Sequence, residues 1–389
     1  MTNKTLLDFS SCMKIEFFLV TLIILFTVLR QDTLISFCFA LSFIMLLLYT
    51  VNRICQYKFS VMLLLLIILA FSNVVWNASN SPEAQLGFDY FKKVLMFSAF
   101  MLIFYYAQED SVTTKTYDSL VKMVCIAGLL LLISYFFFGN TDTLGDGIIL
   151  GFSNPNFCGM WLLHIFIYVF MFGVMKKRSI RMRMLLFAVL AIIAWMIAET
   201  KARSCLIGLF VFCVFCLIGK LLDPNKVLNR IVLGVVILFP IVLVGIYHQL
   251  LNSAWFLRFF SFMVSEGKGL DSRLRIWEPA LRLLRENIWL GDYCGISNGL
   301  GVSQLHNTHL DVLCSYGILP FLIFIYMLYT KCKKAICKKM NYCNYCAMCG
   351  FLAIIVMGAF EAAVVSGAMG MNILTAGLIV LANRPVPEE

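Results

Sequence analysis

The sequence predicts an all-α polytopic membrane protein with about twelve transmembrane helices and one large external loop that carries an amphipathic helix. Hydrophobic residues make up 61% of the 389-residue chain and charged residues 13%, whereas soluble domains carry about 25% charged residues. The mean hydropathy is +0.90. The apolar stretches are continuous and approach the roughly 20 residues of a helical span, while a membrane barrel needs shorter, alternating segments.

Twelve apolar segments follow one another, and the first, seventh and eleventh are short. The expected spans are 15–29, 34–51, 59–76, 91–107, 121–138, 157–175, 184–198, 204–219, 231–247, 310–329, 347–360 and 364–382. They divide the chain into a membrane region (1–251), a polar loop (252–307) and a second membrane region (308–389). No small-residue cleavage site follows the polar start, so we expect no cleavable signal peptide.

The basic residues indicate the orientation of the spans. If both termini lie in the cytoplasm, 20 of the 31 lysines and arginines are cytoplasmic, including five within 176–183 and five within 331–339. This agrees with the positive-inside rule, and the loop 252–307 is then external. The net charge of +10 therefore follows mostly from membrane topology and does not indicate nucleic acid as a partner.

Six of the eleven external basic residues lie in the loop 252–307, which makes the loop the first place to look for chemistry. The alternative is that long loops are translocated regardless of their charge. The fifteen cysteines lack secreted-type spacing and are expected to be reduced. Cys343, Cys346 and Cys349 form a C-x2-C-x2-C pattern, but the ending of a ferredoxin motif is missing.

The external loop contains an amphipathic helical segment. Its apolar stripe, with spacings of three and four, comprises Leu274, Trp277, Leu281, Leu284 and Ile288. A charged face beside the stripe comprises Arg275, Glu278, Arg282 and Arg285. Pro279 indicates that the helix either kinks or begins there. We interpret Arg282 and Arg285 as contacts to lipid head groups at the membrane surface.

Basic residues at two places in the chain are candidates for binding an anion. Arg273 precedes the apolar stripe and can point into the bundle, and Lys201 and Arg203 occupy a very short external turn between the seventh and eighth spans. A guanidinium group is always charged and matches phosphate oxygens in pairs. The alternative is that these side chains extend to the membrane interface only to solvate their charge.

His306 lies just before the tenth span and is the candidate general base, because histidine titrates near pH 6.5. His306 and His309, three residues apart, would share one helix face. We expect no metal there, because HExxH is absent and Asp311 faces elsewhere. The alternative is that both histidines are ordinary hydrogen-bonded residues at the interface.

The turn before the sixth span carries two asparagines, Asn154 and Asn156. Their amides suit sugar hydroxyls, although a turn that starts a helix explains them equally well. His164, inside that span, is expected to be a core histidine with satisfied hydrogen bonds.

Several short motifs, taken in order, resemble the O-antigen polymerase and ligase superfamily of multi-span inner-membrane glycosyltransferases. The motifs are Thr200-Lys-Ala-Arg-Ser, Ser272-Arg-Leu-Arg-Ile-Trp277, Trp289-Leu-Gly, Leu305-His-Asn307 with Leu310, and Tyr316-Gly-Ile318. The architecture matches over nearly the whole length, while the motifs lie between Thr200 and Ile318. One departure is that the usual Ser-Arg or Thr-Arg turn is Lys-Ala-Arg in this chain, which leaves the role of Lys201 open.

The resemblance implies transfer of a glycan from undecaprenyl pyrophosphate to a sugar hydroxyl, without a metal, a nucleotide sugar or another cofactor. It implies that His306, Arg273 and Arg203 are catalytic. We further expect substrate contacts from Arg275, Lys201, Asn307, His309, Asn154 and Asn156. The active site would face the periplasm from the bacterial inner membrane, with membrane lipids around the bundle and a separate chain-length-regulating co-polymerase as partner.

Among members of this group, the short stretch between Arg273 and His306 and the Asn-Pro-Asn context favour a polymerase, which uses a second lipid-linked repeat unit as acceptor. An O-antigen ligase, which uses lipid A-core, is the first alternative. A protein-glycosylating oligosaccharyltransferase is less favoured, because no added C-terminal periplasmic segment is present. A flippase for the same glycan is the alternative from another class, but transporter sites lie at mid-membrane rather than at one face.

Overall fold

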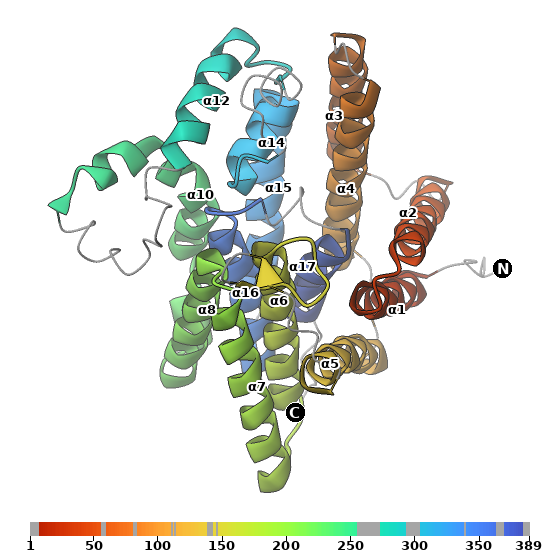
Figure 1. Ribbon diagram of the computed structural model, residues 1–389, viewed down its shortest axis with the longest axis vertical. Helices are drawn as coiled ribbons and strands as arrows, with labels where there is room; N and C mark the ends of the chain where they lie inside the picture. Colours follow the sequence, from red (N-terminus) through yellow and green to blue (C-terminus); the bar gives the residue numbers. More distant parts are fainter. Residues whose placement is uncertain are drawn as a thin grey trace.

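The computed structural model describes residues 8–55, 60–80, 84–109, 112, 114–137, 143–144, 147–254, 273–292, 304–337, 340–362 and 369–383. Within these ranges the chain forms fifteen helices and one two-stranded antiparallel ribbon. The ribbon pairs Thr143 with Ile148 and Leu144 with Gly147. The fold is therefore all-α, as the sequence predicts (Figure 1).

The elements carry the labels of Figure 1. The first half comprises α1 (Phe9–Val28), α2 (Asp32–Cys55), α3 (Val61–Asn80), α4 (Ala84–Glu109), α5 (Thr114–Phe137), β1 (Thr143–Leu144), β2 (Gly147–Ile148), α6 (Pro155–Val174) and α7 (Ile180–Glu199). The second half comprises α8 (Arg203–Leu221), α9 (Pro224–Val227), α10 (Arg230–Leu251), α12 (Leu274–Glu286), α14 (Thr308–Tyr316), α15 (Ile318–Ile336), α16 (Tyr342–Met357) and α17 (Met369–Ala382).

Each of the twelve expected spans overlaps one of these helices, or α14 and α15 together for the tenth. Seven described helices are long and apolar enough to cross a membrane: α1, α2, α5, α6, α7, α8 and α10. A multi-pass membrane protein is thereby supported, whereas the count of twelve spans stays a prediction.

The central helices are buried on all sides, and the peripheral ones are not. Every residue of α16 from Asn344 to Met357 is buried, whereas the buried residues of α7 are Ile193, Met196 and Ile197. Apolar side chains such as Phe187 cover the exposed surface of α7. A helix that is apolar all round and exposed on one side is typical of a span whose outer face contacts lipid.

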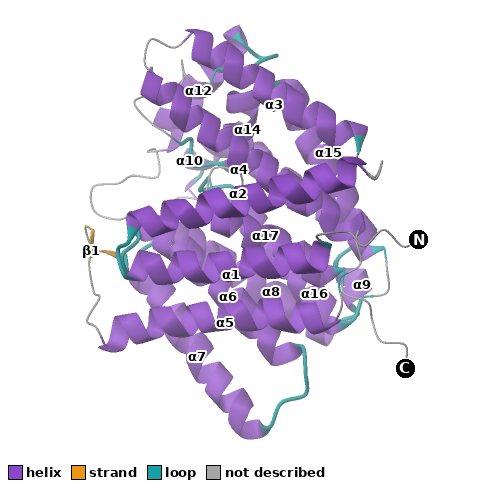
Figure 2. Cartoon of the chain, turned by 90° about the vertical axis from the view of Figure 1, so that its right-hand side faces the viewer, coloured by secondary structure: helices purple, strands orange, loops and turns teal. Residues whose placement is uncertain are grey.

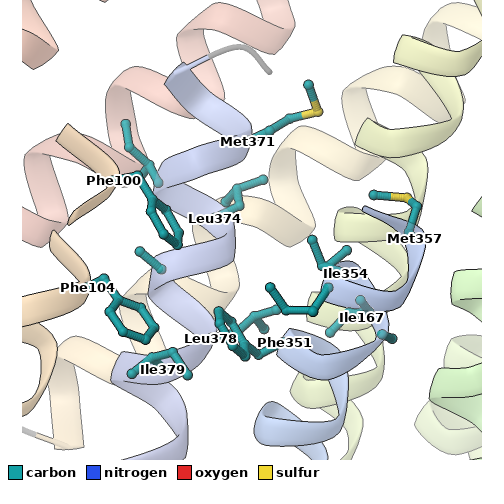
Figure 3. Packing of buried hydrophobic residues seen from close by; sticks show 14 of the residues in the cluster. Phe100, Phe104, Ile167, Phe351, Ile354, Met357, Met371, Leu374, Leu378 and Ile379 are labelled. Carbon is teal, nitrogen blue, oxygen red and sulfur yellow. The ribbon is translucent and has the colours of Figure 1, made fainter. Parts of the chain in front are cut away.

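The core lies where α4, α16 and α17 meet (Figure 3). The rings of Phe100 and Phe104 stack at 5.6 Å, and Phe104 stacks on Phe351 at the same distance. Tyr168 of α6 donates a 2.7 Å hydrogen bond to the carbonyl of Leu374 in α17, so the tyrosine hydroxyl buried in this core has a partner.

The tenth expected span is not one continuous helix. It divides at Gly317 into α14 and α15, because Gly317 has φ +82°, in a region that only glycine adopts readily. The segment after α12 lies against this break: Ile318 donates to the carbonyl of Ile288, and Asp292 donates to that of Cys314, both at 2.9 Å. Expecting one unbroken span from 310 to 329 was therefore wrong, because a remote backbone segment supplies the partners at the break.

Five polar chain segments gather at one end of the bundle. They are the start of α6, the turn between α7 and α8, the residues before α12, the residues before α14, and the residues after α16. In Figure 2, β1, which precedes α6, and α9, which links α8 to α10, lie at opposite ends of the helices. The candidate site is at the β1 end.

Candidate functional site

The site is built around a buried carboxylate, Glu361, which is 4% exposed. Its Oε1 accepts hydrogen bonds from Nη2 of Arg273 at 3.1 Å and from Nδ2 of Asn156 at 2.9 Å. Its Oε2 lies 2.9 Å from Nδ1 of His306. Three side chains that are far apart in the sequence thus converge on one acidic group.

Each member of this Glu361 cluster occupies the end of a helix, where the chain is free to aim a side chain inward. Asn156 lies in the first turn of α6, Arg273 precedes α12, His306 lies two residues before α14, and Glu361 follows α16. The Glu361 backbone is fixed as well, because its carbonyl accepts a 3.2 Å hydrogen bond from the hydroxyl of Thr308.

The backbone of His306 is held on both sides. Trp277 of α12 donates from Nε1 to the carbonyl of Leu305 at 2.8 Å. Asn307 accepts from the N–H of Leu310 and so caps α14, and its Nδ2 donates to the carbonyls of Pro240 and Ala359 at 2.8 and 3.0 Å. Between these anchors His306 adopts φ +50°, a strained conformation for a residue with a Cβ.

The ring of His306 is held by Glu361 on one side. Its side chain is 30% exposed, and Nδ1 faces Glu361, which leaves Nε2 as the nitrogen that can reach a substrate. A carboxylate on one ring nitrogen fixes the tautomer and stabilises the imidazolium that forms when the other nitrogen accepts a proton.

The turn between α7 and α8 brings a second guanidinium to the cluster. Thr200 donates to the carbonyl of Ile197 at 2.6 Å and accepts from the N–H of Ala202 at 3.2 Å. Lys201 has φ +56° and is exposed, and Arg203 is partly buried at the start of α8. Arg203 lies close enough to Arg273 for their positive charges to repel.

The charges of Glu361, Arg273 and the neighbouring Arg203 do not cancel. Arg203 and Arg273 contribute +2 and Glu361 −1, which leaves +1 when His306 is neutral. Arg273 is 24% exposed and Arg203 is partly buried, so neither guanidinium group is fully enclosed by the described residues. The arrangement suits a ligand that carries phosphate oxygens beside a group that gives up a proton.

The structure therefore brings together four of the residues expected from the sequence: His306, Arg273, Arg203 and Asn156. Lys201 lies on the same turn as Arg203. Asn154 caps α6 by accepting a 2.8 Å hydrogen bond from the N–H of Phe157, as the helix-start alternative describes. Asn307 is fully buried, and its described side-chain hydrogen bonds all go to backbone groups.

The other two expected substrate contacts differ in burial. Arg275 is exposed on α12, two residues after Arg273. His309 is fully buried, with its ring 6.2 Å from that of Phe321 and 5.6 Å from that of Phe324. The expectation that His306 and His309 share a helix face was wrong, because α14 begins only at Thr308 and His306 lies outside it.

The core histidine agrees with expectation, and the amphipathic helix does so in part, because Ile288 of the expected stripe lies after the end of α12 and is exposed. In α12, Trp277, Ala280 and Leu284 are buried, while Arg282 and Arg285 are exposed; the helix begins before Pro279 and continues through it. His164 is fully buried, and its two ring nitrogens contact the carbonyl of Met160 and the hydroxyl of Thr375, each at 2.8 Å.

The cysteine pattern is part of a helix interface. Cys346 and Cys349 are buried in α16, which packs against α8. Within the ranges that the structure describes, no three His, Cys, Asp or Glu side chains are arranged to hold a metal ion. The loop residues 255–272 and 293–303, including Arg258, Lys268 and Ser272, lie outside the described residues.

Glu361 is the site residue that the sequence analysis missed. It falls in the short turn between the eleventh and twelfth expected spans, on the side that the sequence analysis expects to be external. A signal was present, because Glu361 is the only acidic residue between Asp311 and Glu388. A single carboxylate in a turn between apolar spans, on the side that carries several external arginines, is a candidate partner for them.

The short motifs of the sequence are in contact in the fold. The Trp277 indole bonds the carbonyl of Leu305, next to His306. The stretch from Trp289 to Gly291 lies so close to Gly317 that a Cβ on Gly317 would come within 2.2 Å of the Trp289 carbonyl oxygen. No protein family model, no curated protein and no solved structure matches the chain.

Proposed function

We propose that this chain is an O-antigen polymerase, a glycosyltransferase that needs no metal. Its donor would be a glycan linked to undecaprenyl pyrophosphate, and its acceptor the terminal sugar hydroxyl of another lipid-linked repeat unit. The observation that carries the proposal is the Glu361 cluster: a histidine oriented by a carboxylate lies beside two arginines at one end of a membrane bundle.

The chemistry assigns a role to each side chain. The acceptor hydroxyl oxygen attacks the anomeric carbon of the donor while Nε2 of His306 takes the hydroxyl proton. The bond between the anomeric carbon and the pyrophosphate oxygen breaks, and the oxygen keeps the electron pair. Arg203 and Arg273 neutralise the departing pyrophosphate, which is where charge develops in the transition state.

Glu361 completes this mechanism by acting on two partners. Its contact with His306 holds the imidazole and stabilises the positive charge that proton transfer creates. Its contact with Arg273 holds the guanidinium at the cluster before a donor is bound. Asn156, bonded to the same carboxylate, keeps one amide oxygen for a sugar hydroxyl.

The proposed surroundings follow from the same assignment. The bundle lies in the bacterial inner membrane with both termini in the cytoplasm, and the Glu361 cluster faces the periplasm, where lipid-linked repeat units are joined. Lys201 and Arg275, which are exposed, would contact more distant parts of the glycan or of the pyrophosphate. Polymer length would be set with a co-polymerase.

The test replaces the proposed base. In His306→Ala we expect normal insertion into the membrane and no glycan transfer, measured as polymer length and amount with membranes that hold equal quantities of protein. The matched control is Arg282→Ala, an exposed residue of α12 on the charged face, which should keep normal polymer. Normal polymer length and amount in His306→Ala would refute the general-base assignment.

A further inference from the structure

A second buried charged pair lies outside the Glu361 cluster. Nζ of Lys93, in α4, is 2.8 Å from both carboxylate oxygens of Asp311, in α14. The two side chains are 7% and 2% exposed. Burying two opposite charges costs desolvation energy that their attraction often only just offsets, so such a pair is weak support for stability alone.

The pair is joined to the backbone that carries His306. Oδ1 of Asp311 also accepts a long hydrogen bond, 3.5 Å, from the N–H of Leu305. The carbonyl of the same Leu305 accepts from Trp277. The N–H and the carbonyl of Leu305, the residue before His306, are therefore each bonded to a side chain. The acceptor of the N–H, Asp311, is itself held by Lys93.

The opposite end of α14 is held by α4 again and by α3. Because Gly317 ends α14, the last carbonyls of the helix lack partners within it. Tyr90 of α4 donates to the carbonyl of Ser315 at 2.6 Å, and Asn73 of α3 donates to that of Tyr316 at 2.5 Å. The α4 helix thus bonds α14 near both of its ends, and α3, which lies beside α14 in Figure 1, bonds the second end.

We propose that Lys93 is a positioning residue for His306, acting through Asp311 and the N–H of Leu305. A positive φ at a residue with a Cβ persists only where the surrounding structure enforces it, and the pinned Leu305 and Asn307 do so at His306. Lys93 fixes the direction of the Asp311 carboxylate, and with it the angle at which the His306 ring meets Glu361. The inference rests on the proposed function for its catalytic consequence only.

The first variant, Lys93→Met, removes the charge that holds Asp311. Misplacing a catalytic group by about 1 Å costs about 100-fold in rate, so we expect a fall in kcat of that order with little change in KM for the lipid-linked donor. The pH dependence of kcat should also shift, because the contact between His306 and Glu361 is disturbed. Lys122→Met, at an exposed residue of α5, is the matched control and should leave the rate and the pH profile unchanged.

A double variant separates positioning from folding. Lys93→Met with Asp311→Leu removes both charges, and replacing a buried pair by apolar groups is often neutral or stabilising. We expect it to restore thermal stability while kcat stays low, because the N–H of Leu305 has lost its acceptor. A double variant with wild-type kcat would overturn the proposal and reduce the pair to a packing role.

A readout that needs no substrate keeps this inference separate from the proposed function. Diethylpyrocarbonate modifies accessible imidazole nitrogens, and peptide mass analysis reports each histidine. In Lys93→Met we expect the modification rate of His306 to change by about threefold or more as its backbone loosens. His164, with both ring nitrogens bonded, is the internal control. An unchanged rate at His306 would contradict the positioning role even if no glycan transfer were ever detected.

Discussion

Replacing Glu361 by glutamine removes the negative charge on which the proposed mechanism depends and leaves the shape of the side chain nearly unchanged. Arg273, His306 and Asn156 all contact this carboxylate at 2.9 to 3.1 Å. The amide oxygen of glutamine can still accept from Arg273 and Asn156, which both bond Oε1, but an NH2 group then faces Nδ1 of His306. An NH2 donor there favours the tautomer with its proton on Nε2, the nitrogen that the mechanism needs free, and the imidazolium of His306 has no anion beside it.

The size of the effect follows from the contact with His306. A hydrogen bond to a charged group contributes about 1.5 to 3 kcal/mol. At about 1.36 kcal/mol for each factor of ten, its loss in the transition state corresponds to a rate about 10 to 150 times lower. The loss in the free energy of unfolding should stay below the roughly 3 to 5 kcal/mol of a fully buried pair, because Arg273 and His306 are partly exposed.

The assay is the rate of polymer formation from undecaprenyl-pyrophosphate-linked repeat units by purified Glu361→Gln, together with its thermal unfolding in detergent. The matched control is Glu278→Gln, an exposed glutamate of α12, which should retain the wild-type rate. Wild-type activity in Glu361→Gln would refute the argument that the carboxylate orients the base. A protein that fails to fold would be distinguished by the unfolding measurement.

Further predictions concern the arginines and the break after α14. Arg273→Lys and Arg203→Lys should remain about tenfold or more below wild type in transfer rate, because an ammonium group cannot reproduce the paired contacts of a guanidinium; full activity of either variant would show that charge alone suffices. Gly317→Ala should lower the free energy of unfolding by at least about 1 to 3 kcal/mol, because of its φ of +82° and because the new Cβ would come within 2.2 Å of the Trp289 carbonyl oxygen. Gly245→Ala, with open space around the new Cβ, should not lower it. Equal thermal stability of these two variants would contradict the geometry of the break.

The helices were predictable because a long, continuous apolar segment by itself indicates a helix that spans the membrane. The expected spans and the described helices differ mainly at their ends, as at α6, where Asn154 caps a helix that begins at Pro155 rather than at residue 157. Such ends depend on hydrogen bonds of single side chains. The break at Gly317 was not predictable in the same way, because its hydrogen-bonding partners come from the segment after α12.

The basic residues of the candidate site were predictable from the sequence, whereas its carboxylate, Glu361, was not. The arginines and His306 stand out in an apolar sequence because charged groups at a membrane face need a reason. Glu361 binds partners 55, 88 and 205 residues away, so no local spacing connects it with them. His309 was placed incorrectly relative to His306 because His306 has a positive φ and therefore lies outside the helix that contains His309. Contacts from remote segments, such as that of Trp277 with the Leu305 carbonyl, impose this backbone conformation.

The most direct test of the central claim is the size distribution of glycan made by purified protein from lipid-linked repeat units, with and without lipid A-core. A ladder formed from the lipid-linked donor alone is the result that a polymerase predicts. Product that appears only with lipid A-core would contradict the polymerase assignment in favour of a ligase. No product under either condition would contradict glycan transfer altogether and favour transport of the same lipid-linked substrate.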